Sequence, residues 1–243
     1  MKFIRVFLTV CLAAFSFAAF AAAPMVKMQA PGFYRTMIGD FEVTALSDGT
    51  VPLPMDTLLN GISRDDLNKA LAHHHLSLPL ETSVNGFLIN TGEKLILIDA
   101  GAGSFFGPTV GKLAANLKAS GYQPEQVDEI YLTHPHPDHL GGLIADGQRV
   151  FPNALVRLDQ KDADFAMKDE KMGSALKPYM DAGMFKAYNG DTELAPGIRV
   201  VNATGHTPGH SVYQFESKGQ KFVAMGDLIH VAAIQFDTPS VAV

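Results

Sequence analysis

The stretch from Thr133 to Gly142 constrains this chain more than any other, because positions 134 to 139 hold three histidines and one aspartate. Neutral imidazole and carboxylate are the usual protein ligands of zinc and similar divalent ions. The apolar run at 129–133 predicts a short buried strand that leads directly into the cluster. Histidines also gather on surfaces, and the run at 73–75 is typical of that. A cluster at the mouth of a buried strand, followed by two glycines, instead predicts a metal site.

The spacing inside this cluster predicts two pairs of ligands. The intervening prolines fix their own φ and keep the residues before them out of the helical region, so the backbone stays extended. His134 and His136, two positions apart, then project to the same side. Asp138 and His139 follow where the backbone turns, and they can face a second ion beside the first. One loop therefore offers two ligands to each of two neighbouring divalent metal ions.

The first 21 residues have the order of a secretory signal peptide. Lys2 and Arg5 form the positive region, 6–17 form the apolar region, and the sequence AFA at 19–21 fits a cleavage site. The apolar region is too short for a typical membrane span, and an uncleaved N-terminal anchor is the alternative. We therefore predict a periplasmic or secreted protein with no stable membrane anchor, whose single domain covers 22–243.

Composition limits what the mature chain can use. Cys11 is the only cysteine, so the mature chain has no disulfides and must rely on core packing and metal. Any metal ligands must then be histidine and carboxylate. Loss of Lys2 and Arg5 changes the formal net charge from −6 to −8, which argues against nucleic acid as a partner. About 220 residues are enough for one domain with a sizeable core.

The segments around the cluster predict alternating strands and helices. Residues 94–99 predict a strand, and 112–120 predict a helix that precedes the strand at 129–133. This order is typical of an α/β layer with its chemistry at the carboxyl end of a strand. Residues 22–40 are expected to be irregular, and the strand at 41–46 is expected to stop at Ser47-Asp48-Gly49. The other predicted elements are strands at 84–90, 154–158, 198–203, 211–216 and 222–225, and helices at 64–72, with Ser63 as N-cap, and 159–167.

Two features leave alternatives open. Asp99 ends a buried strand, where a lone carboxylate is costly unless it is paired. It is either a residue that supports the metal loop or an ordinary turn carboxylate. Residues 168–188 are rich in methionine and aromatic side chains. They form either one wall of an apolar substrate pocket or plain core and surface, and the second interpretation is favoured because methionine fills irregular gaps anywhere.

The pattern His-x-His-x-Asp-His at 134–139 resembles the signature of the metallo-β-lactamase-fold hydrolases. Two further segments in the right order, TGHTPGH at 204–210 and Gly226-Asp227, extend the resemblance over about 40–243. The resemblance implies that His206 is the third histidine on the first metal and that Asp227 is the carboxylate shared by both metals. It also implies catalytic roles for Asp138 and Asp227. His210 is expected to support the site rather than to bind metal.

The resemblance implies an α/β fold of the α+β kind, a four-layer αββα sandwich with the metals at one edge. In that family another histidine, well after the shared aspartate, completes the second metal site. This chain has no histidine after His230, which lies only three positions past Asp227 and so too early for that role. The sequence is therefore expected to be a C-terminally truncated version of a longer hydrolase, with an apolar tail and no terminating helix.

The chemistry implied is hydrolysis assisted by two divalent metal ions, zinc first and manganese, iron or cobalt as alternatives. The run from Gly226 to Ala233, together with the signal peptide, resembles the exported methyl-parathion-hydrolase-like branch. That branch implies a small ester-like substrate, a lactone or an organophosphate triester. The alternatives are a β-lactam, a glutathione thioester, and a non-catalytic metal-binding exported protein. The sequence leaves the oligomeric state open, with a homodimer as one option.

Overall fold

Two sheets carry the fold in the computed structural model, which describes residues 23–243. Pro31–Val243 forms one unit, and it contains all the elements named below. The predicted signal peptide lies outside the described residues. Among those residues no helix combines the length and the hydropathy needed to cross a membrane.

The larger sheet has seven strands in the order β1-β2-β3-β4-β5-β8-β9. The strands β1 to β4 pair antiparallel, whereas β4, β5, β8 and β9 pair parallel. The smaller sheet is an antiparallel meander in the order β10-β11-β12-β13. The bounds are β1 Phe33–Ile38, β2 Phe41–Leu53, β3 Leu80–Asn90, β4 Leu95–Ile98, β5 Glu129–Tyr131, β8 Leu155–Asp159, β9 Phe185–Tyr188, β10 Thr192–Ala195, β11 Ile198–Asn202, β12 Ser211–Ser217 and β13 Gln220–Ala224.

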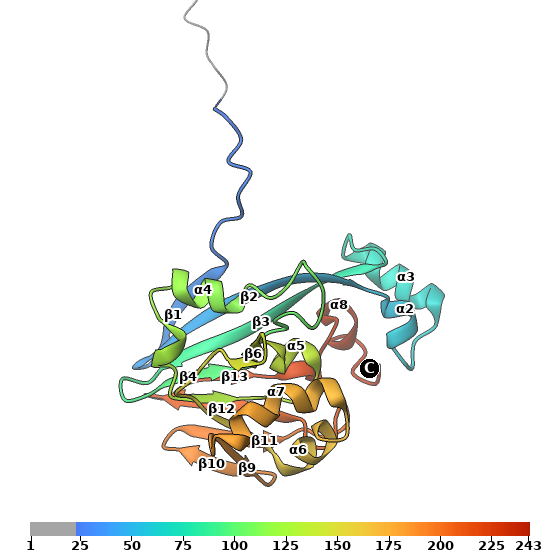
Figure 1. Cartoon of the computed structure of the whole chain (residues 1–243). Helices are drawn as coiled ribbons and strands as arrows, with labels where there is room; N and C mark the ends of the chain where they lie inside the picture. The colour runs from blue at the N-terminus through green and yellow to red at the C-terminus, as the bar shows by residue number, and fades with distance from the viewer. Residues whose placement is uncertain (1–22) are drawn as a thin grey trace, which may run out of the picture. The chain divides into compact units, whose positions relative to one another are not determined.

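Short helices connect these strands (Figure 1). Figure 1 shows α4 over β2, and among the strands it is β2 against which α4 mainly packs. The helices are α2 Met55–Leu58, α3 Arg64–His73, α4 Leu113–Ala119, α5 Pro137–Leu140, α6 Gln160–Ala166, α7 Glu170–Asp181 and α8 Ala232–Gln235. Three 3₁₀ turns, η1 Pro124–Gln126, η2 Gly141–Leu143 and η3 Gly226–Leu228, and a small hairpin of β6 Ile144–Ala145 and β7 Gln148–Arg149 complete the chain.

The alternation of side chains along β4 shows how the layers pack. Leu95 and Leu97 enter a core that includes residues of α4 and α7, whereas Ile96 and Ile98 enter a second core shared with β11 and β12. Successive side chains of a strand point to opposite faces, so one face of the large sheet carries helices and the other packs on the small sheet. The mixed α/β sandwich predicted from the sequence is confirmed.

The predicted strand–helix–strand unit is also confirmed. The strands β4 and β5 pair in parallel with Leu97 opposite Ile130, and α4 lies between them in the chain. Gly121, just past this helix, has the positive φ of +101° that suits a helix end. In α3, the predicted N-cap Ser63 accepts the Asp66 backbone N–H. The cluster at 134–139 therefore follows the carboxyl end of a buried parallel strand.

Two local expectations were wrong. Residues 33–38 are not irregular, because they form β1, and the whole of β1 pairs with the first half of β2. The strand that begins at Phe41 does not stop at Ser47-Asp48-Gly49, because a bulge between Ser47 and Gly49 lets β2 continue to Leu53. A turn-like sequence can be absorbed as a bulge when the partner strand is long, and β3 supplies that partner.

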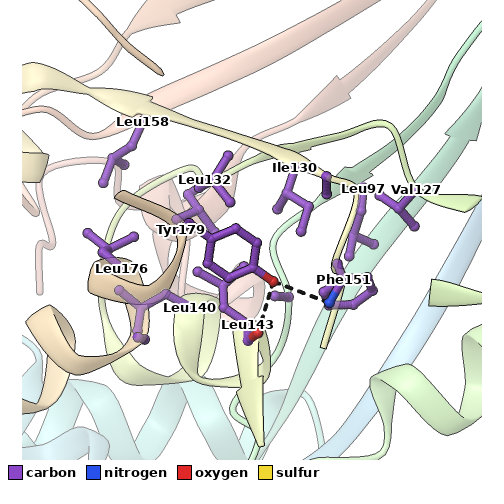
Figure 2. Packing of buried hydrophobic residues seen from close by; sticks show 14 of the residues in the cluster. Leu97, Val127, Ile130, Leu132, Leu140, Leu143, Phe151, Leu158, Leu176 and Tyr179 are labelled. Atoms are coloured by element: carbon purple, nitrogen blue, oxygen red, sulfur yellow. Dashed lines mark hydrogen bonds between the residues drawn. The ribbon is translucent and has the colours of Figure 1, made fainter. Parts of the chain in front are cut away.

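The methionine-rich segment forms α7 and β9, and it belongs to the core. Tyr179 of α7 is fully buried, and its hydroxyl donates to the Leu143 carbonyl at 3.0 Å and accepts the Phe151 N–H at 3.2 Å (Figure 2). Met172 packs in the same cluster. The interpretation as plain core is therefore the right one for these buried residues.

The C-terminal residues contain a short helix before the apolar tail, and both pack on the rest of the fold. Residues 232–235 form α8, and Ile234 packs with Leu67 and Leu71 of α3 in a separate apolar cluster. Val241 is buried there, and the last residues form a bridge between Asn60 and Ala242. The tail is thus packed against α2 and α3, which the apolar pattern alone did not indicate.

Candidate metal centre

Four side chains form the first ligand group: His134, His136, His206 and Asp227. They come from the loop after β5, the loop after β11 and η3, and each offers an atom within 4.8 Å of the others. His136 Nδ1 lies 3.0 Å from His134 Nε2 and 2.9 Å from His206 Nε2. Three ring nitrogens that point at one another match the three-histidine donor set of zinc sites.

Burial keeps these imidazoles neutral. It lowers the pKa of His134 well below its ordinary value, and it lowers the pKa of His136 in the same direction. Burial also lowers the pKa of His206 to about 4. A neutral imidazole keeps a lone pair on the nitrogen that faces its neighbours, and this is the form that binds a divalent cation. The donor set therefore fits a metal ion.

The second group consists of Asp138, His139 and Asp227, which again lie within 4.8 Å of one another. His139 Nε2 is 3.6 Å from Asp138 Oδ2 and 3.1 Å from Asp227 Oδ1. Burial alone would lower the pKa of His139, but Asp227, Asp99 and Asp138 together raise it well above its ordinary value. Such an excess of negative charge around one imidazole is what a bound cation would neutralise.

Asp227 belongs to both groups. Its Oδ1 faces His139, whereas its Oδ2 lies 3.5 Å from His206 Nε2 and 3.8 Å from His134 Nε2. Burial opposes its charge, yet His139 and the hydrogen bonds from His139 and His230 hold the pKa of Asp227 well below its usual range. An ionised carboxylate with one oxygen toward each group can bridge two cations.

Asp99 supports the loop after β5 that carries residues 134–139. Its contacts decide between the two interpretations of this residue. Its Oδ1 accepts the Thr133 N–H at 2.8 Å, and its Oδ2 accepts the Thr133 hydroxyl at 2.9 Å and His139 Nδ1 at 2.9 Å. Asp99 adopts a left-handed φ of +56°, which brings its carboxylate under the loop. It is therefore not an ordinary turn carboxylate.

The same contacts set where the imidazole protons lie. An ionised carboxylate only accepts, so the Thr133 hydroxyl must donate to Asp99. That hydroxyl can then accept from His134 Nδ1, which lies 3.1 Å away. His139 Nδ1 likewise donates to Asp99. Both histidines thus hold a proton on Nδ1, and Nε2 is the ring nitrogen that faces the ligand groups.

Two glycines let the loop approach its neighbour closely. A Cβ on Gly141 would lie 2.1 Å from the Ala102 carbonyl oxygen, and one on Gly142 would lie 2.0 Å from that of Ala100. No side chain fits at either position. The Gly141-Gly142 pair therefore packs the turn after the ligands directly onto the chain that follows β4.

His210 and His230 flank the groups without joining them. His210 Nε2 accepts the Asp227 N–H at 3.0 Å, so this buried histidine positions the shared carboxylate, which agrees with the supporting role expected for it. His230 Nε2 lies 3.0 Å from Asp227 Oδ2, the oxygen that faces the first group. It does not reach Asp138 and His139, as its early position in the sequence implied.

Comparison with known families agrees with this geometry. A family model described as the metallo-beta-lactamase superfamily matches residues 79–240. The chain belongs to the metallo-beta-lactamase superfamily.

Individual relatives in this superfamily include hydrolases. The N-acyl homoserine lactonase AiiA of Bacillus thuringiensis subsp. kurstaki is 27% identical over 177 residues, which are 65% of this chain and 66% of the lactonase. The match thus spans just under two thirds of that relative. The crystal structure of hydrolase AbOPH in the beta lactamase superfamily is 40% identical, with a TM-score of 0.83, over 89% of this chain and 80% of AbOPH. AidC, a dizinc quorum-quenching lactonase in complex with a product, is 27% identical, with a TM-score of 0.77, over 86% and 78%.

A cavity of about 1100 Å³ opens onto the two ligand groups. Its walls are mostly apolar, and they come from β2, β3, the loop after β4 and the segment after Asp227. Its polar end holds His136, Asp138, His206 and His230. No lysine or arginine is among the residues that line it, all of which lie in the described part of the chain. The cavity therefore has an apolar body and a metal-ligand end, without a fixed cation.

The structure brings all six predicted ligands together: His134, His136, Asp138, His139, His206 and Asp227. Sequence reasoning missed the contact of His230 with Asp227 and the role of Thr133. The sequence did show Thr133 directly before the first histidine and His230 three residues after the shared aspartate, but neither position indicates a contact without the fold.

Proposed function

We propose that this protein is a metallo-hydrolase that holds two divalent metal ions, zinc first among them, and opens lactones or related neutral esters. The observation that carries the proposal is the pair of ligand groups joined by Asp227 at the end of an apolar cavity. The donor set supports zinc, because it combines imidazole and carboxylate without thiolate. The relationship to AidC, a dizinc lactonase, supports the same metal.

The charge of the cavity supports a neutral substrate. A β-lactam or a glutathione thioester carries carboxylates, and a site that binds such groups normally offers arginine or lysine. The lining residues offer none, and they include the carboxylates of Glu81, Asp138 and Asp227. A lactone with an apolar acyl group, or a phosphate triester, has no charge to be repelled. The lactone ranks first because AiiA and AidC are described as lactonases.

The chain's own residues have separate roles in this reaction. Bound divalent ions would supply Lewis-acid activation of water and of the scissile carbonyl group. Asp227 fixes the spacing of the two ligand groups through its two oxygens. Asp138 lies at the cavity end, and its Oδ2 can take the proton that the attacking water loses and pass it to the leaving oxygen. The apolar walls hold the acyl group and exclude water around the carbonyl.

A panel of four substrates tests the proposal. We expect zinc-loaded protein to hydrolyse N-hexanoyl homoserine lactone, with lower turnover of a neutral aryl phosphotriester, a benzylpenicillin and S-lactoylglutathione. His206→Ala should abolish turnover, whereas His73→Ala, which removes an exposed histidine on α3, should not change it. Two bound zinc ions without turnover of any of the four would instead support the non-catalytic metal-binding protein.

Export is a further part of the proposal, and it rests on the sequence at 1–21. The mature protein should then begin near Ala22 and occur in the periplasm or the medium. N-terminal sequencing of protein from the cell envelope tests this, and an intact Met1 on cytosolic protein would contradict it.

A further inference from the structure

Asp162 is a fully buried carboxylate next to the loop that carries His206. It lies in the first turn of α6, the helix that follows β8. Its Oδ2 accepts the Thr207 hydroxyl at 2.7 Å, and its Oδ1 accepts the Gly209 N–H at 2.7 Å. Burial of a carboxylate costs free energy even when it is hydrogen-bonded, so core packing alone does not explain this residue.

The partners of Asp162 flank His206 on its C-terminal side. Thr207 is the next residue and is itself buried, and its carbonyl accepts the Gly205 N–H at 3.2 Å. The two bonds to Asp162 therefore hold the short turn of residues 205–209 to α6. The position of the His206 ring follows the backbone of this turn.

His206 differs from two other ligand-group histidines in how it is oriented. His134 has the Thr133 hydroxyl beside its Nδ1, and His139 has the Asp99 carboxylate. The hydrogen-bond contact found for His206 runs from Nε2 toward His136, within the ligand group. Among the described residues its Nδ1 has no hydrogen-bond partner comparable to Thr133 or Asp99, so the turn that Asp162 holds sets where the His206 ring enters the ligand group.

Gly209 lets the turn pack closely against the start of α6, whose own N-cap bonds other segments. Asp159, the N-cap of α6, accepts the Lys161 N–H at 2.8 Å and the Gly190 N–H at 2.9 Å. A Cβ on Gly209 would lie 2.6 Å from Asp159 Oδ1, so the turn lies directly against the helix. A glycine at this position lets the Gly209 N–H reach Asp162 without a clash.

We infer that Asp162 is a positioning residue for the first ligand group, acting through Thr207 and Gly209 on His206 without touching the site. This inference rests on the metal site proposed above. It predicts that Asp162 sets the affinity of the first metal more than that of the second, because Asp138 and His139 lie on the other loop, which Asp99 and Thr133 hold.

The variants are chosen to separate positioning from simple stability. Asp162→Asn keeps the shape but turns a donor toward either Thr207 or Gly209. Thr207→Val replaces the hydroxyl with a methyl group, whereas Thr207→Ser keeps the hydroxyl. Asp159→Asn is the matched control, because it changes a buried carboxylate of the same helix start that does not bond Thr207.

The measurement is zinc affinity by competition with a chromophoric chelator, together with the thermal midpoint of the metal-free protein. His206→Ala identifies which of the two equivalents belongs to the first group. We expect Asp162→Asn and Thr207→Val to weaken that equivalent about 10–100-fold, with a much smaller change in the other. Thr207→Ser should keep the wild-type zinc affinity. Asp159→Asn should also keep the zinc affinity, while it lowers the thermal midpoint.

Wild-type affinity of both equivalents in Thr207→Val and Asp162→Asn would overturn the inference and leave the proposed function intact. Equal weakening of both equivalents, in proportion to the thermal midpoint and shared by Asp159→Asn, would also overturn it, since that is the result of a structural role. Wild-type protein that binds no zinc would overturn the metal site and this inference together.

Discussion

Asp99→Asn tests the arrangement that holds the second ligand group. The carboxylate accepts three hydrogen bonds, two from Thr133 and one from His139 Nδ1. An asparagine has the same shape and tolerates the left-handed φ of this residue, but one of its two atoms is now a donor. Either the His139 N–H or a Thr133 donor must therefore face an N–H₂ group.

The magnitude follows from that mismatch. A buried donor left without an acceptor costs about 1–3 kcal/mol. His139 can relieve the conflict by giving up its Nδ1 proton and keeping a proton on Nε2, but Nε2 is the atom that faces Asp138 and Asp227. A metal ion that binds Nε2 would displace this proton and bring the conflict at Nδ1 back. At about 1.4 kcal/mol per tenfold, the second metal should bind about 10–100-fold more weakly.

The assay is zinc competition with a chelator, resolved into two equivalents. The first equivalent should change less, because Asp99 reaches His134 only through the Thr133 hydroxyl. Asp48→Asn is the control, since Asp48 is equally buried and accepts three backbone N–H groups but no imidazole. An unchanged second equivalent in Asp99→Asn, or a loss of the same size in Asp48→Asn, would refute the reasoning.

Three further predictions concern pH, the shared carboxylate and the core. Burial raises the pKa of Asp162 to about 6 from its usual 3.8, so the folded protein holds this proton to higher pH than the unfolded chain does. The free energy of unfolding of the metal-free wild type should therefore fall by about 3 kcal/mol, relative to Asp162→Asn, between about pH 4 and 6. Urea denaturation at several pH values measures this, and the same pH dependence of the free energy of unfolding in both proteins would contradict it. In Gly226→Ala, a Cβ would lie 2.7 Å from His210 Nε2 at a φ of +55°, so both metal equivalents should be lost, as elemental analysis can show. Tyr179→Phe leaves the Phe151 N–H without its partner and should cost about 1–3 kcal/mol in chemical denaturation, while zinc content per folded chain stays unchanged.

Much of the ligand set followed from local order in the chain. The extended His-Pro-His segment has a period of two that no later packing reverses, so His134 and His136 project together as the spacing predicted. The helix ends at Ser63 and Gly121 and the parallel pairing of β4 with β5 were also readable, because caps and alternating apolar patterns act over a few residues.

Other features were decided only when distant segments met. Asp99 and Asp162 are separate carboxylates in the sequence, and each lies beside a ligand loop only because that loop places N–H or hydroxyl donors against it. The bulge at Asp48 exists because β3 continues beside β2 and the N–H groups of Ala102, Gly111 and Leu113 surround its carboxylate. Short-range sequence patterns fix which donors are available and the local direction of the backbone. The partner that pairs with a buried charge is fixed by long-range packing, since only tertiary structure brings segments 34 or more residues apart to within hydrogen-bond distance.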